Sequence, residues 1–119
     1  MADEDGTSSL ELTCFEIIAQ VGTAKSCYVN AVKAAKEGDL EKAQSLIDEG
    51  DEAYNGGHEV HMGLLQRTAQ GEKLEFTILL LHAEDQMASA ETCRLMAVDF
   101  MDVYGRLAKL EVEQASEQA

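Results

Sequence analysis

The side chains best suited to chemistry lie in residues 79–87, which read LLLHAEDQM. His82 follows three leucines, so we expect its imidazole to border an apolar patch that excludes water. A neutral ring nitrogen in such a place can attack a phosphoryl group that approaches in line. The alternative is a histidine at the edge of a packed helix, bonded to a nearby acceptor. The residue pattern alone leaves both interpretations open.

Gln86 is the polar neighbour that would support this chemistry. It follows His82 by four residues, which places the two side chains one above the other on a helix. Its amide can hold the second ring nitrogen or donate a hydrogen bond to a phosphoryl oxygen. A carboxylate at this position would repel the phosphoryl group, so Gln86 is predicted to support the phosphoryl site.

Asp85 belongs to a heptad seam rather than to an ordinary polar face. The seam consists of Ile78, Leu81, Asp85, Ala88, Thr92 and Leu95. An aspartate in a seam either faces solvent or, when buried, must find a cation or share a proton. If identical helices met around an axis, copies of Asp85 would converge and could bind Mg²⁺ through oxygen ligands.

The elements that carry these residues are predicted to be three long helices, with no β-structure. Apolar residues at three- and four-residue spacing predict a first helix from about residue 10 to residue 36 and a second to about residue 70. A third runs from about residue 76 to residue 112. Gly38 followed by Asp39 predicts a tight turn between the first two helices, and hence an antiparallel up-down-up bundle. Residues 1–9 are predicted to form a flexible tail with an N-cap at Ser8 or Ser9, and residues 10–119 a single domain.

Two features of the predicted helices call for close packing. The second helix contains four glycines, each costing about 1 kcal/mol relative to alanine, so we expect close helix approach to compensate. These are Gly50, Gly56, Gly57 and Gly63. The third helix is apolar on more sides than one hairpin can cover, which predicts self-association.

Composition excludes several classes of partner and site. Nine basic residues against 23 acidic ones give a formal net charge of −14, which disfavours nucleic acid and anionic membranes. The acidic surface either steers a basic protein partner or only maintains solubility. Cys14, Cys27 and Cys93 are odd in number and far apart, which predicts free thiols in a cytoplasmic protein. His58 and His61 have the wrong spacing for the zinc-protease motif, so we expect no zinc there.

The segment LLHAEDQMAS resembles the His-Ala-Gln-Asp-His-Leu-Met signature of the lactose/cellobiose-type enzyme IIA of the bacterial sugar phosphotransferase system. The stretches FEIIAQVGTAKS, AAKEGDLEKA and AYNGGHEVHMGLLQ also resemble that family in order and spacing. The similarity therefore extends over nearly the whole chain after Leu10.

The resemblance implies a homotrimeric phosphocarrier, a phosphotransferase component. His82 aligns with the histidine, phosphorylated at Nε2, that accepts the phosphoryl group from phospho-HPr and passes it to the cysteine of a cognate enzyme IIB. Asp85 aligns with the family's buried aspartate, one per subunit, around a structural Mg²⁺ on the trimer axis. The carrier would not bind sugar itself and would be linked only indirectly to the membrane permease IIC. The transported sugar would be cellobiose, chitobiose, another β-glucoside or lactose.

Three positions depart from the family signature. Glu84 replaces the common glutamine, Gln86 replaces the second histidine, and His61-Met62 stand where Gln-Thr is common. Loss of the second histidine leaves any role toward the phosphoryl group to the Gln86 amide. The alternative function from the residues alone is a helical oligomerisation or scaffold module without catalytic activity.

Overall fold

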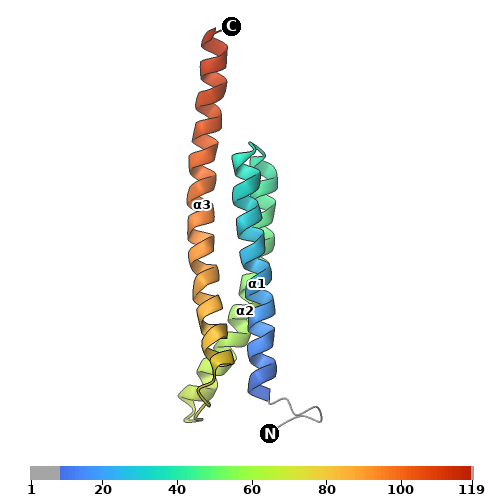
Figure 1. The fold of residues 1–119 in the computed structure, drawn as a ribbon, viewed down its shortest axis with the longest axis vertical. Coiled ribbons are helices and arrows are strands. Elements are labelled where there is room, and N and C mark those ends of the chain that lie inside the picture. Colours follow the sequence, from blue (N-terminus) through green and yellow to red (C-terminus); the bar gives the residue numbers. More distant parts are fainter. Residues whose placement is uncertain (1–8, 119) are drawn as a thin grey trace.

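The computed structural model describes residues 9–118, which form three helices joined by two short connections (Figure 1). They are α1 (Ser9–Lys36), α2 (Leu40–Ala69) and α3 (Ile78–Gln118). The described residues contain no strand, and the predicted up-down-up all-α bundle is confirmed. Helix α3 starts two residues later than expected and continues past residue 112 to Gln118. Most of the predicted tail, and the candidate N-cap Ser8, lie outside the described residues.

The turn between α1 and α2 has the predicted chemistry. Gly38 adopts a φ of 88°, in the left-handed region that glycine enters without a steric penalty. Asp39 then caps α2, because its Oδ1 accepts a hydrogen bond of 3.0 Å from the backbone N–H of Lys42. This turn makes α2 antiparallel to α1, while α1 and α3 run parallel (Figure 1).

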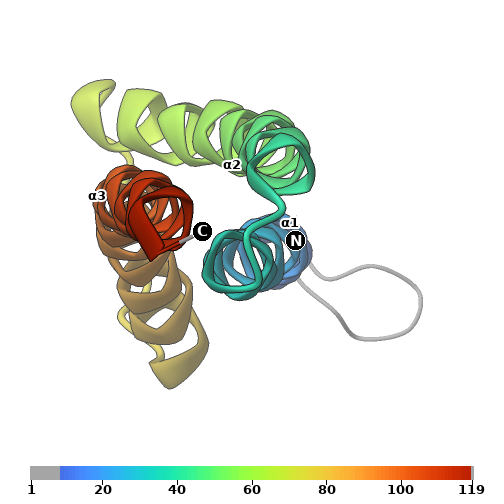
Figure 2. The same cartoon turned by 90° about the horizontal axis from the view of Figure 1, so that it is seen from above.

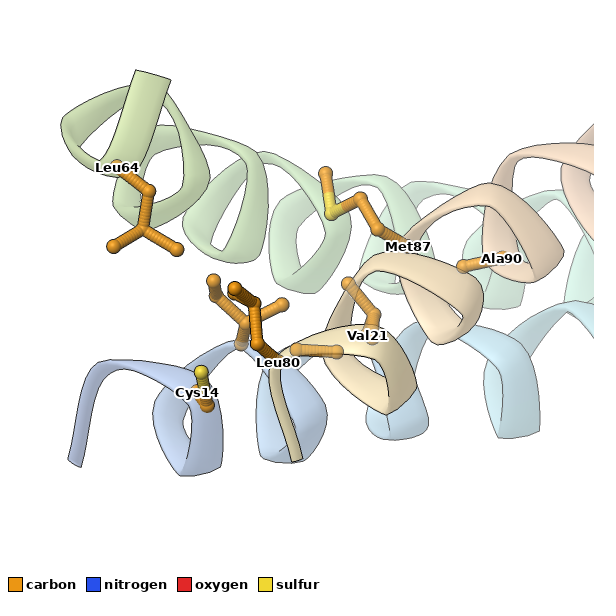
Figure 3. Packing of buried hydrophobic residues seen from close by; sticks show 8 residues of the cluster. Cys14, Val21, Leu64, Leu80, Met87 and Ala90 are labelled. Carbon is orange, nitrogen blue, oxygen red and sulfur yellow. The ribbon is translucent and has the colours of Figure 1, made fainter. Parts of the chain in front are cut away.

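The core follows the predicted stripe of α1, which contacts both other helices. The buried stripe residues are Cys14, Ile17, Val21, Ala24, Tyr28, Ala31 and Ala35. At the end of the bundle near the α2–α3 connection, the first three of them pack with Leu64 of α2 and with Leu80 and Met87 of α3 (Figure 3). This cluster positions the first turns of α3, where the candidate site lies.

Close approach to α1 accounts for most of the glycines in α2. A Cβ added at Gly50 would lie 2.7 Å from Cε1 of Tyr28, and one added at Gly57 would lie 2.9 Å from Cγ1 of Val21. Gly56 is similarly close to Gln20, at 3.2 Å. Gly63 has no such neighbour, so the prediction holds for three of the four glycines.

A polar cluster of Tyr28, Asp51 and Arg94 ties the three helices together at mid-height. The Tyr28 hydroxyl donates to Asp51 Oδ1 at 2.6 Å, and Arg94 donates through Nε and Nη2 to the two carboxylate oxygens at 2.6 and 2.9 Å. The hydrogen bonds from Arg94 lower the pKa of Asp51. Burial and the Asp51 carboxylate raise the pKa of Tyr28 well above its ordinary value. The cluster therefore keeps Asp51 ionised and Tyr28 protonated near neutral pH.

Helix α3 projects beyond the other two helices along the long axis (Figure 1), and the view from above shows the three helices in a triangular arrangement (Figure 2). The α1–α2 turn lies level with Gly105, whose added Cβ would lie 3.4 Å from Leu40 Cδ1. Residues 106–118 continue past this turn, and Leu107, Leu110 and Val112 of this overhang are exposed. Within residues 9–118, no helix combines the length and the apolar character needed to cross a membrane.

Candidate functional site

The first turns of α3 present His82 on the outer surface. Thr77 precedes the helix, and its Oγ1 accepts a hydrogen bond of 3.1 Å from the backbone N–H of Leu80. Leu80 and Ala83 are buried against the other helices, which fixes the rotation of this turn. His82 lies between them in sequence and is exposed.

The three histidines have different surroundings. His58 stacks on Tyr54, with ring centroids 6.1 Å apart, and His61 Nε2 lies 2.7 Å from Glu84 Oε1. His82 forms no hydrogen bond, ion pair or ring contact within residues 9–118. His82 therefore combines exposure with a ring that is not engaged by any other side chain of the described residues.

The pair formed by His61 and Glu84 joins α2 to α3 beside the site. Both residues stand at positions where the sequence departs from the family signature, and the structure brings these two departures together. The sequence alone did not predict this contact. The only sign of it in the sequence is that two departures from the family signature occur on separate helices. The pair holds the Glu84 carboxylate against α2.

Gln86 lies one turn after His82, as predicted, but its contact is with α1. Its Oε1 accepts a hydrogen bond of 3.4 Å from Nζ of Lys25, and both side chains are half-buried. A bond from Gln86 to the His82 ring does not occur within residues 9–118. Lys25 was not among the predicted site residues, because the α1 sequence gives no axial alignment with α3.

The seam around Asp85 is exposed along its whole length. Ile78, Leu81 and Leu95 are 85%, 51% and 59% accessible, and Asp85, Ala88 and Thr92 are also exposed. Asp85 makes no ion pair or hydrogen bond within the described chain. A single chain therefore leaves both the apolar side chains and the carboxylate of this seam in solvent.

An apolar cleft of about 660 Å³ opens beside the site, between the end of α2 and the start of α3. Its walls include Leu65, Leu74, Phe76 and, from α3, Leu81 and Glu84. His82 is not part of the lining, so within one chain the imidazole lies outside this cleft. The apolar patch that the sequence predicted thus lies beside His82 and does not enclose its imidazole within one chain.

Comparison with known proteins assigns this architecture to a family. The family described as "PTS system, Lactose/Cellobiose specific IIA subunit" matches residues 12–105. The chain belongs to this enzyme IIA family. It is therefore a component of the sugar phosphotransferase system and a phosphocarrier in sugar uptake.

Relatives of this enzyme IIA come from several bacteria. The lichenan-specific enzyme IIA component of Bacillus subtilis is 34% identical over 98 residues, which are 82% of this chain and 89% of the relative. The lactose-specific component of Lactococcus lactis is 33% identical over 100 residues, covering 84% and 95%. The crystal structure of the cellobiose-specific enzyme IIA of Bacillus anthracis aligns with a TM-score of 0.86 and 32% identity, over 90% of this chain and 98% of that one.

Proposed function

We propose that His82 carries the phosphoryl group, accepting it from phospho-HPr and passing it to the cysteine of a cognate enzyme IIB. The observation that supports this site is the contrast among the histidines. His58 and His61 are engaged with Tyr54 and Glu84, whereas His82 is exposed and makes no contact in the described chain. Its place in the HAEDQM segment agrees with the family signature.

Each transfer is a displacement at phosphorus. The Nε2 lone pair of neutral His82 forms a new N–P bond while the bond to the donor histidine of HPr breaks, and the donor nitrogen keeps that electron pair. Each ring retains the proton on its other nitrogen, so no proton needs to move. The thiolate of enzyme IIB then forms an S–P bond and His82 recovers its lone pair. The protein mainly positions the groups and excludes water.

The exposed seam on α3 supports assembly as a homotrimer. Three of its residues are large and apolar, and all six seam positions are accessible in one chain. Burying this seam against copies of itself would remove apolar surface from water at about 25 cal/mol per Å². A neighbouring subunit would also cover the surface beside His82, so an isolated subunit would transfer the phosphoryl group poorly.

The donor set at Asp85 fits a Mg²⁺ ion only in such an assembly. Within residues 9–118 of one chain, no group of three His, Cys, Asp or Glu side chains is arranged to hold a metal ion. Three copies of Asp85 around an axis would supply the oxygen ligands that Mg²⁺ requires. The ion would offset the repulsion between the carboxylates, and neither transfer step needs it.

The same proposal places the protein in the cytoplasm, where it would meet HPr and enzyme IIB. Sugar would bind to the membrane permease IIC and not to this carrier. The relatives' names include lichenan, lactose and oligo-β-mannoside. A disaccharide or short oligosaccharide, such as cellobiose, chitobiose, another β-glucoside or lactose, is the class that this relay would serve.

The test is intact-protein mass spectrometry after incubation with enzyme I, HPr and phosphoenolpyruvate. Wild type should gain one acid-labile phosphoryl group, and His82→Ala should gain none. His58→Ala is the matched control, since it removes another exposed imidazole and should be phosphorylated like wild type. An unmodified wild type in the presence of charged HPr, or an adduct that persists in His82→Ala, would overturn the assignment.

A further inference from the structure

Lys25 of α1 stands beside the phosphoryl site, and its charge is not matched by a carboxylate. Its Nζ donates to the neutral amide oxygen of Gln86 at 3.4 Å, a long hydrogen bond. The arginines that form ion pairs in the described chain, Arg67, Arg94 and Arg106, each bind an Asp or Glu. Lys25 forms no such pair within residues 9–118.

The parallel course of α1 and α3 relates this contact to His82. Both helices rise about 1.5 Å per residue, so three residues back along α1 and four back along α3 from the Lys25–Gln86 contact bring Gly22 and His82 to within about 1.5 Å of the same level. A Cβ added at Gly22 would have no atom within 4 Å, which means that α1 leaves open space at this level. Lys25 and the open space at Gly22 therefore lie within about one helical turn of the height of His82 along the bundle.

The charge balance explains why a cation would be needed. The chain already carries a formal charge of −14, and the phosphoryl group adds up to two negative charges. On α3, Glu84 and Asp85 both follow His82 closely, and His61 of α2 contacts the Glu84 carboxylate. Lys25 is the cationic group that α1 contributes at this level. The ammonium attracts a negatively charged phosphoryl group through its full charge, an attraction that the neutral amide oxygen of Gln86 does not offer, so it would favour phosphate over the amide.

We propose that Lys25 is a phosphoryl-binding residue, and that its ammonium leaves Gln86 Oε1 for a phosphoryl oxygen when His82 is phosphorylated. Gly22 keeps the space that the group occupies clear of side chains. Gln86 then holds Lys25 in place while the site is empty. This inference rests on the proposed role of His82 and adds to it a specific counterion from another helix.

The experiment uses phosphoramidate, which phosphorylates histidine without a protein partner. The His82 ring nitrogen forms the new P–N bond, the bond to the protonated amino group breaks, and ammonia leaves with the electron pair. At low ionic strength, Lys25→Met should be phosphorylated about three- to tenfold more slowly than wild type, and the gap should close as salt is added. Lys25→Arg should restore most of the rate.

Two further variants separate charge from structure. Lys33→Met removes another lysine of α1, two turns further along, and should react like wild type. Gly22→Ala adds a methyl group in open space and should fold normally, but it should slow phosphorylation and shift the ³¹P resonance of the phosphorylated protein. Lys25→Met should also shift that resonance, which a merely structural role would not do.

The outcomes distinguish the two proposals. If wild type is modified at His82 neither by phosphoramidate nor by phospho-HPr, the proposed role of His82 itself is wrong. If wild type is modified, but Lys25→Met matches it in rate, salt dependence and ³¹P shift, only the role of Lys25 is overturned.

Discussion

Asp51 and Asp85 are two aspartates of one chain with opposite surroundings. Both oxygens of Asp51 accept hydrogen bonds from Arg94, and one also accepts from Tyr28, so the chain itself satisfies this carboxylate. Asp85 has no partner within the described chain and lies among exposed apolar residues. The difference indicates that the mid-height cluster stabilises the single subunit, whereas the seam on α3 contributes no such contact within one chain and is the surface that we propose to be buried between subunits.

The largest expected effect concerns Asp85. Chelation with EDTA should weaken the wild-type assembly, because the clustered carboxylates would then repel one another. Asp85→Leu removes both the charge and the ligand, so its assembly should be insensitive to EDTA. Sedimentation velocity over a range of concentrations measures this directly. A wild-type oligomer whose assembly is unaffected by EDTA would contradict the proposed Mg²⁺ site. A protein that stays monomeric at high concentration would contradict the proposed assembly through the seam.

Asp51→Ala should destabilise the subunit. It leaves the Arg94 guanidinium and the Tyr28 hydroxyl without their partner, which we expect to cost about 1–3 kcal/mol, given that Arg94 is partly exposed. The free energy of unfolding in urea measures this. Asp102→Ala is the matched control, because its ion pair with Arg106 is largely exposed and should change stability by less than about 0.5 kcal/mol. Equal losses of unfolding free energy in the two variants would mean that the cluster around Asp51 stabilises the subunit no more than the exposed ion pair of Asp102 does.

Gly50→Ala should disturb the same cluster by displacing the ring of Tyr28. The added methyl group would lie 2.7 Å from the Tyr28 ring, and the required shift should cost about 1–2 kcal/mol. Gly63→Ala places the same methyl group in open space and should instead stabilise α2 by up to about 1 kcal/mol. Thermal unfolding of both variants should therefore move in opposite directions. If both variants raised the unfolding temperature, the gain in helix propensity would outweigh the steric contact between the added methyl group and Tyr28.

The smallest expected effect is the pH dependence of the cluster. Because Arg94 lowers the pKa of Asp51, the stabilisation is fully present above the ordinary carboxyl pKa of about 4 and is lost as the pH falls through the lowered value. The stability difference between wild type and Asp51→Asn should therefore shrink below pH 4. A difference that stays constant to acid pH would contradict an ionised Asp51.

Local chemistry made much of the fold predictable. Gly38 and Asp39 defined the first turn, and the three- and four-residue spacing in α1 identified the buried stripe correctly. Periodicity identifies which face of a helix packs, but it does not give the axial alignment of one helix against another. The contacts from Asp51 to Tyr28 and Arg94, across 23 and 43 residues, depend on that alignment and could not be predicted.

The candidate site was predictable to a similar extent. His82, Asp85 and Gln86 lie on one helix, where residue spacing alone determines their relative positions. Lys25 and His61 reach the same region from α1 and α2, so only the assembled bundle reveals them. The signature departures at His61 and Glu84 were visible in the sequence, but their contact was not.

The overhang of α3 has a consequence for how this protein responds to dilution. Residues 106–118 lie beyond the residues matched by the family and have neither α1 nor α2 beside them. A short isolated helix is marginal in water, and this one exposes Leu107, Leu110 and Val112. If the proposed homotrimer also covers these side chains, the helical content of the overhang should depend on subunit concentration, and its susceptibility to proteases would report how much of the protein is assembled at any moment.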